Sequence, residues 1–153
     1  MKTPPVIHGS FTIERRYQAP PERVFAAWAD IAVKARWFAG PDDKWTQVKR
    51  ELDFRVGGAE ILHGKFVGGM ETIFAARYHE IVPNERLVYV YDMHVNGSFM
   101  SVSLASVEIV ADGKGTRLIY TEHASFLDGT DGVKSRETGT IGLLGNLRDV
   151  VDG

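Results

Sequence analysis

The chain has 153 residues, a formal net charge of −2 and no cysteine. This length predicts one domain, spanning residues 1–153, that buries roughly 70% of the surface its unfolded chain exposes. The basic pairs Arg15-Arg16 and Lys49-Arg50 are isolated and form no basic stripe, so we expect no nucleic-acid partner. The lack of cysteine excludes disulfides, thiolate nucleophiles and cysteine zinc sites.

The first residues, MKTPPVIHGS, contain no apolar segment of the kind that a signal peptide requires. No apolar run approaches the ~18 residues of a membrane span, so we expect no membrane association. Together with the lack of cysteine, these features favour a cytoplasmic protein.

The N-terminal part of the chain predicts one strand followed by two helical pieces. The segment SFTIERRYQ alternates as a strand does, with Phe11 and Ile13 on one face. The residues APPERV then begin a helix, with Pro21 in the first turn, where its missing N–H costs little. The apolar face of this helix includes Trp28, which favours a core residue over a wall or lid of a pocket. A second helical piece is expected over residues 32–38.

From Thr46 onward the apolar period changes to two, which predicts β-strands. The six predicted strands have the sequences TQVKRELDF, AEILHGKFV, ETIFAARYHEIV, RLVYVYDMHV, SVSLASVEIV and TRLIYTEHASF. The separators are rich in Gly, Pro, Asn and Asp and mostly have hairpin length, which favours antiparallel pairing. With the first strand, the sheet has about seven strands, enough to curl.

A last helix is predicted over residues 133–151, after the loop LDGTDG, with Asp131 as its expected N-cap. At about 18 residues, or roughly 27 Å, it is the only long element that could cover one face of the sheet. The pattern therefore predicts an α+β fold with a curved antiparallel sheet wrapped around the C-terminal helix. A strongly curved sheet leaves a gap beside such a helix, and we expect an apolar cavity there, plugged at one end by the two short helices.

Seven segments in this order carry a resemblance to a known family: APPERVFAAWAD, ARWFAGP, LDFRVGG, EIVPNERLVYVYDM, SVSLASVEI, GTRLIYTEHASFLDG and RETGT. Their order and spacing resemble the SRPBCC or START-like superfamily, whose fold is called helix-grip. More narrowly, the chain resembles single-domain bacterial homologues of the activator of heat-shock-protein-90 ATPase, also described as polyketide cyclase-like. Many of these relatives have Gly-Trp where this chain has Gly139-Thr140.

The resemblance implies a cavity that binds a small hydrophobic or amphipathic molecule, and a homodimer. It leaves two alternatives open. The first is an enzyme of the cyclase or dehydratase type that uses Glu122 as acid or base. The second is a cochaperone that stimulates the chaperone ATPase. The activators for which the family is named carry an additional N-terminal domain, for which a 153-residue helix-grip chain leaves no room. We therefore rank binding first, catalysis second and the cochaperone role third.

Glu122 is the candidate catalytic residue because of its place on a predicted strand. If Leu118 and Tyr120 face the concave side, Glu122 faces it too, since side chains alternate along a strand. A carboxyl group there is partly desolvated, which favours its neutral form. It would then be an acid, a base or a ligand anchor; the structural alternative is a partner for a tyrosine hydroxyl or for Arg136.

The other candidates have alternative interpretations as well. Trp37, at the end of the second helical piece, either joins the core or closes the pocket. Arg55 is either a surface charge beside Asp53 or a cation at the pocket mouth for an anionic ligand. His63 is the preferred pocket histidine; the histidine spacing favours no metal site, and we expect no cofactor. The full candidate ligand-binding set is Trp37, Phe38, Arg55, His63, Tyr89, Tyr91, Met93, Tyr120, Glu122, Arg136, Thr140 and Leu144.

Three glycines, Gly139, Gly142 and Gly145, lie at three-residue spacing in the predicted C-terminal helix. Each costs about 1 kcal/mol relative to alanine in a helix interior. They are either tolerated positions, sites of close contact with the sheet, or a thinned surface that makes room for ligand.

Overall fold

The computed structural model describes residues 2–153. Its elements are β1 (Ile7–Tyr17), α1 (Pro21–Ala29), α2 (Ile31–Lys34), β2 (Trp45–Leu52), β3 (Ala59–Phe66), β4 (Glu71–Val82), β5 (Arg86–Val95), β6 (Ser98–Asp112), β7 (Gly115–Phe126) and α3 (Val133–Val151). The predicted order of one strand, two helices, six strands and one helix is confirmed. The hairpin-length Gly and Asn turns favour antiparallel pairing of consecutive strands.

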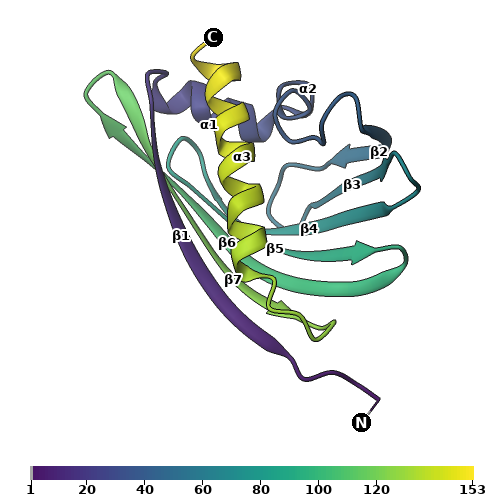
Figure 1. Ribbon diagram of the computed structural model, residues 1–153. Coiled ribbons are helices and arrows are strands. Elements are labelled where there is room, and N and C mark those ends of the chain that lie inside the picture. Colours follow the sequence, from purple (N-terminus) through teal and green to yellow (C-terminus); the bar gives the residue numbers. More distant parts are fainter. Residues whose placement is uncertain (1) are drawn as a thin grey trace.

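The seven strands form one antiparallel sheet in the order β1-β7-β6-β5-β4-β3-β2. Six of the strands follow a simple meander, and β1 pairs with β7 at one edge. Figure 1 shows the sheet curving around α3, which lies across its concave face. This is the α+β helix-grip fold that the sequence predicts.

The concave face of the sheet carries most of the core. On β7, Leu118, Tyr120 and Glu122 are buried, and so is every second residue from Thr116 to Phe126. The strand register places Glu122 opposite Ala105 on β6, which in turn lies opposite Tyr89 on β5. Three strands therefore bring their inward side chains into one row beneath α3.

The two short helices lie at one end of the sheet, beside the C-terminal half of α3 (Figure 1). Helix α1 begins at Pro21, and its inner face buries Val24, Ala27 and Trp28. Helix α2 is shorter than the predicted 32–38 segment: it ends at Lys34, and the chain continues in turns. The side chain of Asp30 caps α2 by accepting a hydrogen bond from the backbone N–H of Ala32 at 2.9 Å.

Helix α3 has the predicted bounds, but its expected N-cap was wrong. Gly132 occupies the N-cap position and makes no side-chain cap bond, and Asp131 is exposed one residue earlier. In the middle of the helix, the Tyr17 hydroxyl of β1 donates a hydrogen bond to the Leu144 carbonyl at 3.0 Å. Its buried face consists of Thr140, Leu144, Leu147 and Val151. Among residues 2–153, no helix has both the length and the apolar character that crossing a membrane would require.

Candidate functional site

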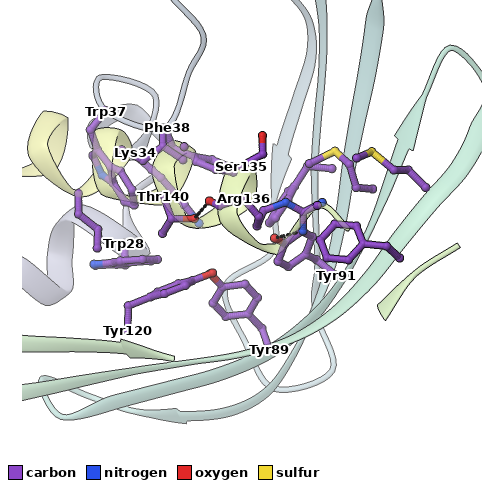
Figure 2. A pocket seen from close by; sticks show the side chains of 18 of the residues that line it. Trp28, Lys34, Trp37, Phe38, Tyr89, Tyr91, Tyr120, Ser135, Arg136 and Thr140 are labelled. Atoms are coloured by element: carbon purple, nitrogen blue, oxygen red, sulfur yellow. Dashed lines mark hydrogen bonds between the residues drawn. The ribbon is translucent and has the colours of Figure 1, made fainter. Parts of the chain in front are cut away.

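A cavity of about 490 Å³ lies between the concave face of the sheet, α2 and α3. Figure 2 shows Tyr89 and Tyr120 on one side of it, with Thr140 and Arg136 on the other. The predicted candidates that border it are Trp37, Phe38, Tyr89, Tyr91, Met93, Tyr120, Arg136, Thr140 and Leu144. This volume falls in the range typical of small-molecule sites in proteins.

Three predicted candidates, Arg55, His63 and Glu122, do not border the cavity. Arg55 is exposed, and its Nε donates to Asp53 Oδ2 at 2.9 Å, so the surface alternative describes it. His63 points to the convex face, because side chains alternate on β3 and its neighbour Leu62 is in the core. The His63 Nε2 atom lies 3.7 Å from Glu71 Oε2 on β4. The assignment of Arg55 and His63 to the pocket is therefore corrected.

Glu122 lies behind the cavity wall rather than in it. Its side chain is fully buried, and its Oε1 accepts a hydrogen bond from the Tyr120 hydroxyl at 2.6 Å. Its Oε2 accepts from the Tyr91 hydroxyl at 2.7 Å and from Arg136 Nη1 at 3.1 Å. The three donors border the cavity, whereas Glu122 does not. The Glu122 carboxylate thus orients Tyr91, Tyr120 and Arg136, which border the cavity, without bordering it itself.

Arg136, in the first turns of α3, is held by four acceptors. Besides Glu122, its Nη1 donates to the Tyr91 hydroxyl oxygen at 2.8 Å and to Ser103 Oγ at 3.3 Å. Its Nη2 donates to Ser101 Oγ at 2.8 Å. The two serines lie two residues apart on β6 and are buried, so both hydroxyl oxygens point inward and accept hydrogen bonds from the guanidinium.

Burial changes the acid–base behaviour of the tyrosines at this wall. Desolvation raises the pKa of Tyr91 above its ordinary value, and the neighbouring Glu122 carboxylate raises it further. Desolvation also raises the pKa of Tyr120, with smaller contributions from Tyr89 and Glu122. Both hydroxyls therefore stay protonated and remain hydrogen-bond donors to the carboxylate.

A second buried ionic cluster lies on the other side of the cavity, and the candidate set did not include it. Lys34 Nζ donates to Glu60 Oε1 at 2.7 Å, and the Tyr78 hydroxyl donates to the same oxygen at 2.6 Å. Lys34 and Glu60 are 3% and 2% exposed, and Lys34 borders the cavity. Desolvation lowers the pKa of Lys34, an effect that Glu60 opposes.

Aromatic rings surround the Lys34 ammonium group. Its Nζ lies 5.0 Å from the ring centroid of Phe38, 5.4 Å from that of Trp28 and 6.0 Å from that of Trp37. Trp28 and Trp37 stack edge to face with centroids 4.7 Å apart. The expected choice between core and pocket for these tryptophans is therefore not exclusive, because both are buried and both border the cavity.

The cavity has a closed end and a mouth. Trp28, Lys34 and Trp37 are all at most 3% exposed and form the closed end. Thr130 and Asp131, in the loop before α3, are exposed and also border the cavity, so they belong to its mouth. Figure 2 shows Lys34 with Trp37 and Phe38 on one side of the view and Arg136 with Tyr91 on the other.

Sequence reasoning missed Lys34 and Glu60, although one signal pointed to them. Glu60 has the same parity as the apolar Leu62 on the predicted strand, which places a carboxylate on an inward face. A buried carboxylate requires a donor or a cation. Lys34 itself carries no local signal, because a single lysine in a short helix is most often solvated. Within residues 2–153, no cluster of three His, Cys, Asp or Glu residues could hold a metal ion.

The family comparison matches residues 18–151 to the model of the activator of Hsp90 ATPase homolog 1-like protein family. No match was found among curated proteins. The chain is 44% identical to the Mll3558 protein from Rhizobium loti over 95% of this chain and 99% of that one, with a TM-score of 0.88. A protein from Rhizobium leguminosarum is 36% identical over 96% of each chain, with a TM-score of 0.91.

A third solved structure shares the fold at lower identity. The AHSA1-like protein from Aeromonas hydrophila is 24% identical, covers 94% of this chain and 92% of that one, and has a TM-score of 0.73. The family match begins directly after β1 and covers all three helices and the whole β2–β7 meander that builds the cavity. The chain therefore belongs to the activator of Hsp90 ATPase homolog 1-like family of the SRPBCC superfamily.

Proposed function

We propose that this protein binds a small hydrophobic or amphipathic molecule in the cavity between the sheet and α3. The observation that carries the proposal is the cavity itself, with a volume of about 490 Å³ and buried aromatic rings at its closed end. A few fixed polar groups, from Tyr91, Tyr120 and Arg136, interrupt the apolar wall. Apolar walls with a small number of placed polar groups are typical of small-molecule sites.

The position of Glu122 favours binding over catalysis. A general acid or base must come within hydrogen-bond reach of its substrate. Both oxygens of Glu122 are already engaged by Tyr91, Tyr120 and Arg136, and these residues separate it from the cavity. Its role in the proposal is to position the donors that face the ligand, and the protein functions as a binding protein.

Helix α3 offers a matched pair of variants for testing the proposal. Gly139 borders the cavity, and among the described residues no heavy atom beyond its chain neighbours and the adjacent helix backbone lies within 4 Å of a Cβ built there. The replacement Gly139→Leu therefore fits the helix and puts its side chain at the cavity. Gly142 also has open space around its Cβ but does not border the cavity, so Gly142→Leu is the control.

The experiment measures binding of the uncharged probe N-phenyl-1-naphthylamine by fluorescence titration. Wild type and Gly142→Leu should bind the probe with similar affinity, and Gly139→Leu should bind it at least about tenfold more weakly, a difference of ~1.4 kcal/mol. Native mass spectrometry of freshly purified protein adds a direct test for a retained molecule. Equal affinities of all three proteins, or no binding by wild type, would overturn the proposal.

A further inference from the structure

Lys34 keeps one hydrogen-bond donor free at the closed end of the cavity. A lysine ammonium has three N–H donors. Two of them have protein acceptors, Glu60 Oε1 at 2.7 Å and the Tyr78 hydroxyl oxygen at 3.3 Å. Within residues 2–153, no third acceptor contacts Nζ, and aromatic ring faces surround it. A ligand oxygen that reaches the closed end would satisfy this donor without displacing any existing bond.

At the same end of the cavity, Lys34 and Glu60 form an ion pair whose charges cancel. The Lys34 Nζ and Glu60 Oε1 atoms lie 2.7 Å apart, so the ammonium already has its counter-ion. The charge of Arg50, on β2, acts on both Lys34 and Glu60, but Arg50 does not border the cavity, and its Nη2 donates to the Phe38 carbonyl at 2.7 Å. A carboxylate ligand would therefore lose its hydration here without gaining an unpaired cation.

The mouth side of the cavity is balanced in the same way. The Arg136 guanidinium is paired with the fully buried Glu122 at 3.1 Å, and its remaining contacts are neutral hydroxyls. Asp131, at the exposed rim, adds a negative charge. Neither end of the cavity presents a cation without its counter-ion, and the rim repels anions.

From this charge balance, and resting on the proposed function, we infer that the ligand is an uncharged molecule with an apolar body and a carbonyl-type oxygen that Lys34 binds at the closed end of the cavity. Lys34 is then the residue that determines specificity, and Glu60 sets the charge preference. The apolar body lies against the aromatic walls that Trp28, Phe38 and Tyr89 provide.

The test uses three naphthalenes that share one skeleton: 2-acetylnaphthalene, 2-naphthoate and 2-ethylnaphthalene. Each competes with N-phenyl-1-naphthylamine for wild-type protein, so binding itself is established by the probe alone. The ketone should bind about tenfold more tightly than the hydrocarbon, since only the ketone oxygen gains a hydrogen bond from a charged donor. The carboxylate should bind at least about tenfold more weakly than the ketone, because it must be desolvated without a free cation.

Two variants then assign the effect to Lys34 and Glu60. Glu60→Gln leaves Lys34 without its counter-ion, so the preference should reverse in favour of 2-naphthoate by about tenfold or more. The double variant Lys34→Met with Glu60→Gln removes both charges together, and it should bind the ketone and the hydrocarbon within about twofold of each other. Glu80→Gln neutralises an exposed carboxylate that pairs with Arg86, and it should behave as wild type.

The outcomes separate the two proposals. If the probe binds but wild type binds 2-naphthoate with the same affinity as the ketone, the uncharged-ligand inference is overturned and the proposed function stands. If the double variant still prefers the ketone over the hydrocarbon, Lys34 is not the donor. If Glu60→Gln does not fold, the wild-type ranking and the double variant still decide. Failure of wild type to bind the probe or any of the three compounds would overturn both proposals.

Discussion

The hydroxyl of Tyr120 donates a hydrogen bond at 2.6 Å to Oε1 of Glu122, two residues further along β7. Residues two apart on a strand point to the same face, yet Tyr120 borders the cavity and Glu122 does not. A buried charge is thereby kept out of the ligand space while its effect on the cavity-facing donors remains. The first prediction concerns the stability that this arrangement contributes.

Replacing Glu122 with Gln should lower the free energy of unfolding by about 3 kcal/mol, because it leaves the largely buried Arg136 without its counter-ion. Urea denaturation measures the change. The matched control is Asp112→Asn, which removes an exposed carboxylate paired with Arg16 and should cost less than ~1 kcal/mol. Equal losses in the two variants would contradict the view that Glu122 is the buried organising charge.

All five tyrosines of the chain should titrate only when the protein unfolds. Desolvation raises the pKa of each of them above its ordinary value of 10.0: Tyr17, Tyr78, Tyr89, Tyr91 and Tyr120. The folded state therefore holds protons that the unfolded state releases above pH 10. The stabilisation is complete below that pH and is lost as the pH rises, by up to about 7 kcal/mol per pH unit for five groups.

Tyrosinate absorbance in the near ultraviolet and far-ultraviolet circular dichroism measure the two events in one alkaline titration. The absorbance should stay flat until the circular dichroism signal collapses, and both should then change together. In denaturant, the same chain should titrate near its ordinary pKa. A gradual rise of absorbance centred near pH 10, with secondary structure intact, would contradict the burial of these hydroxyls.

Gly142→Ala should stabilise the protein by about 1 kcal/mol, since Gly142 is exposed in α3 and an added Cβ meets open space. Gly115→Ala is the contrasting change. A Cβ built at Gly115 lies 2.3 Å from the backbone carbonyl oxygen of Tyr17, so it should destabilise the β1–β7 edge by about 1–3 kcal/mol. Thermal melts of the two variants should shift in opposite directions, and a shared direction would refute the assignment.

Asp30→Ala should lower stability by about 1 kcal/mol, because the Asp30 side chain accepts hydrogen bonds from the Ala32 and Val33 backbone N–H groups. Helix α2 also carries Lys34, so the ketone preference in the naphthalene competition should weaken as well. Asp30→Asn keeps an acceptor oxygen and should restore both properties. Loss of ligand preference in the Asn variant equal to that in the Ala variant would show that the cap does not act through this oxygen.

The strands and helices could be predicted because local periodicity is visible in the amino-acid sequence. The segments 71–82, 86–95 and 133–151 have the predicted bounds, since alternation or helical spacing runs without interruption between Gly, Pro or Asn breaks. Helix α2 ends earlier than predicted, at Lys34, because its aromatic residues are drawn into the core by turns rather than by further helix. The periodicity of the sequence gives no information on tertiary contacts that end a helix early.

The same contrast explains the candidate site. Parity along β7 predicted that Tyr120 and Glu122 share a face, but it could not show that the tyrosine borders the cavity while the carboxylate does not. His63 was the preferred pocket histidine, but the parity of β3 does not decide its face, because Ile61 and Leu62 make both parities look apolar. Which of two apolar faces becomes concave depends on the pairing of all seven strands.

By itself, the amino-acid sequence determined the order of the elements, the antiparallel meander and the family, because turns and periodicity are short-range properties. Only the tertiary structure brought Lys34 to Glu60, 26 residues apart, and Arg136 to Ser101, 35 residues apart. Buried charges are tolerated only in pairs, and each partner comes from a different element. The balanced electrostatics of the cavity therefore emerge when the sheet closes around α3.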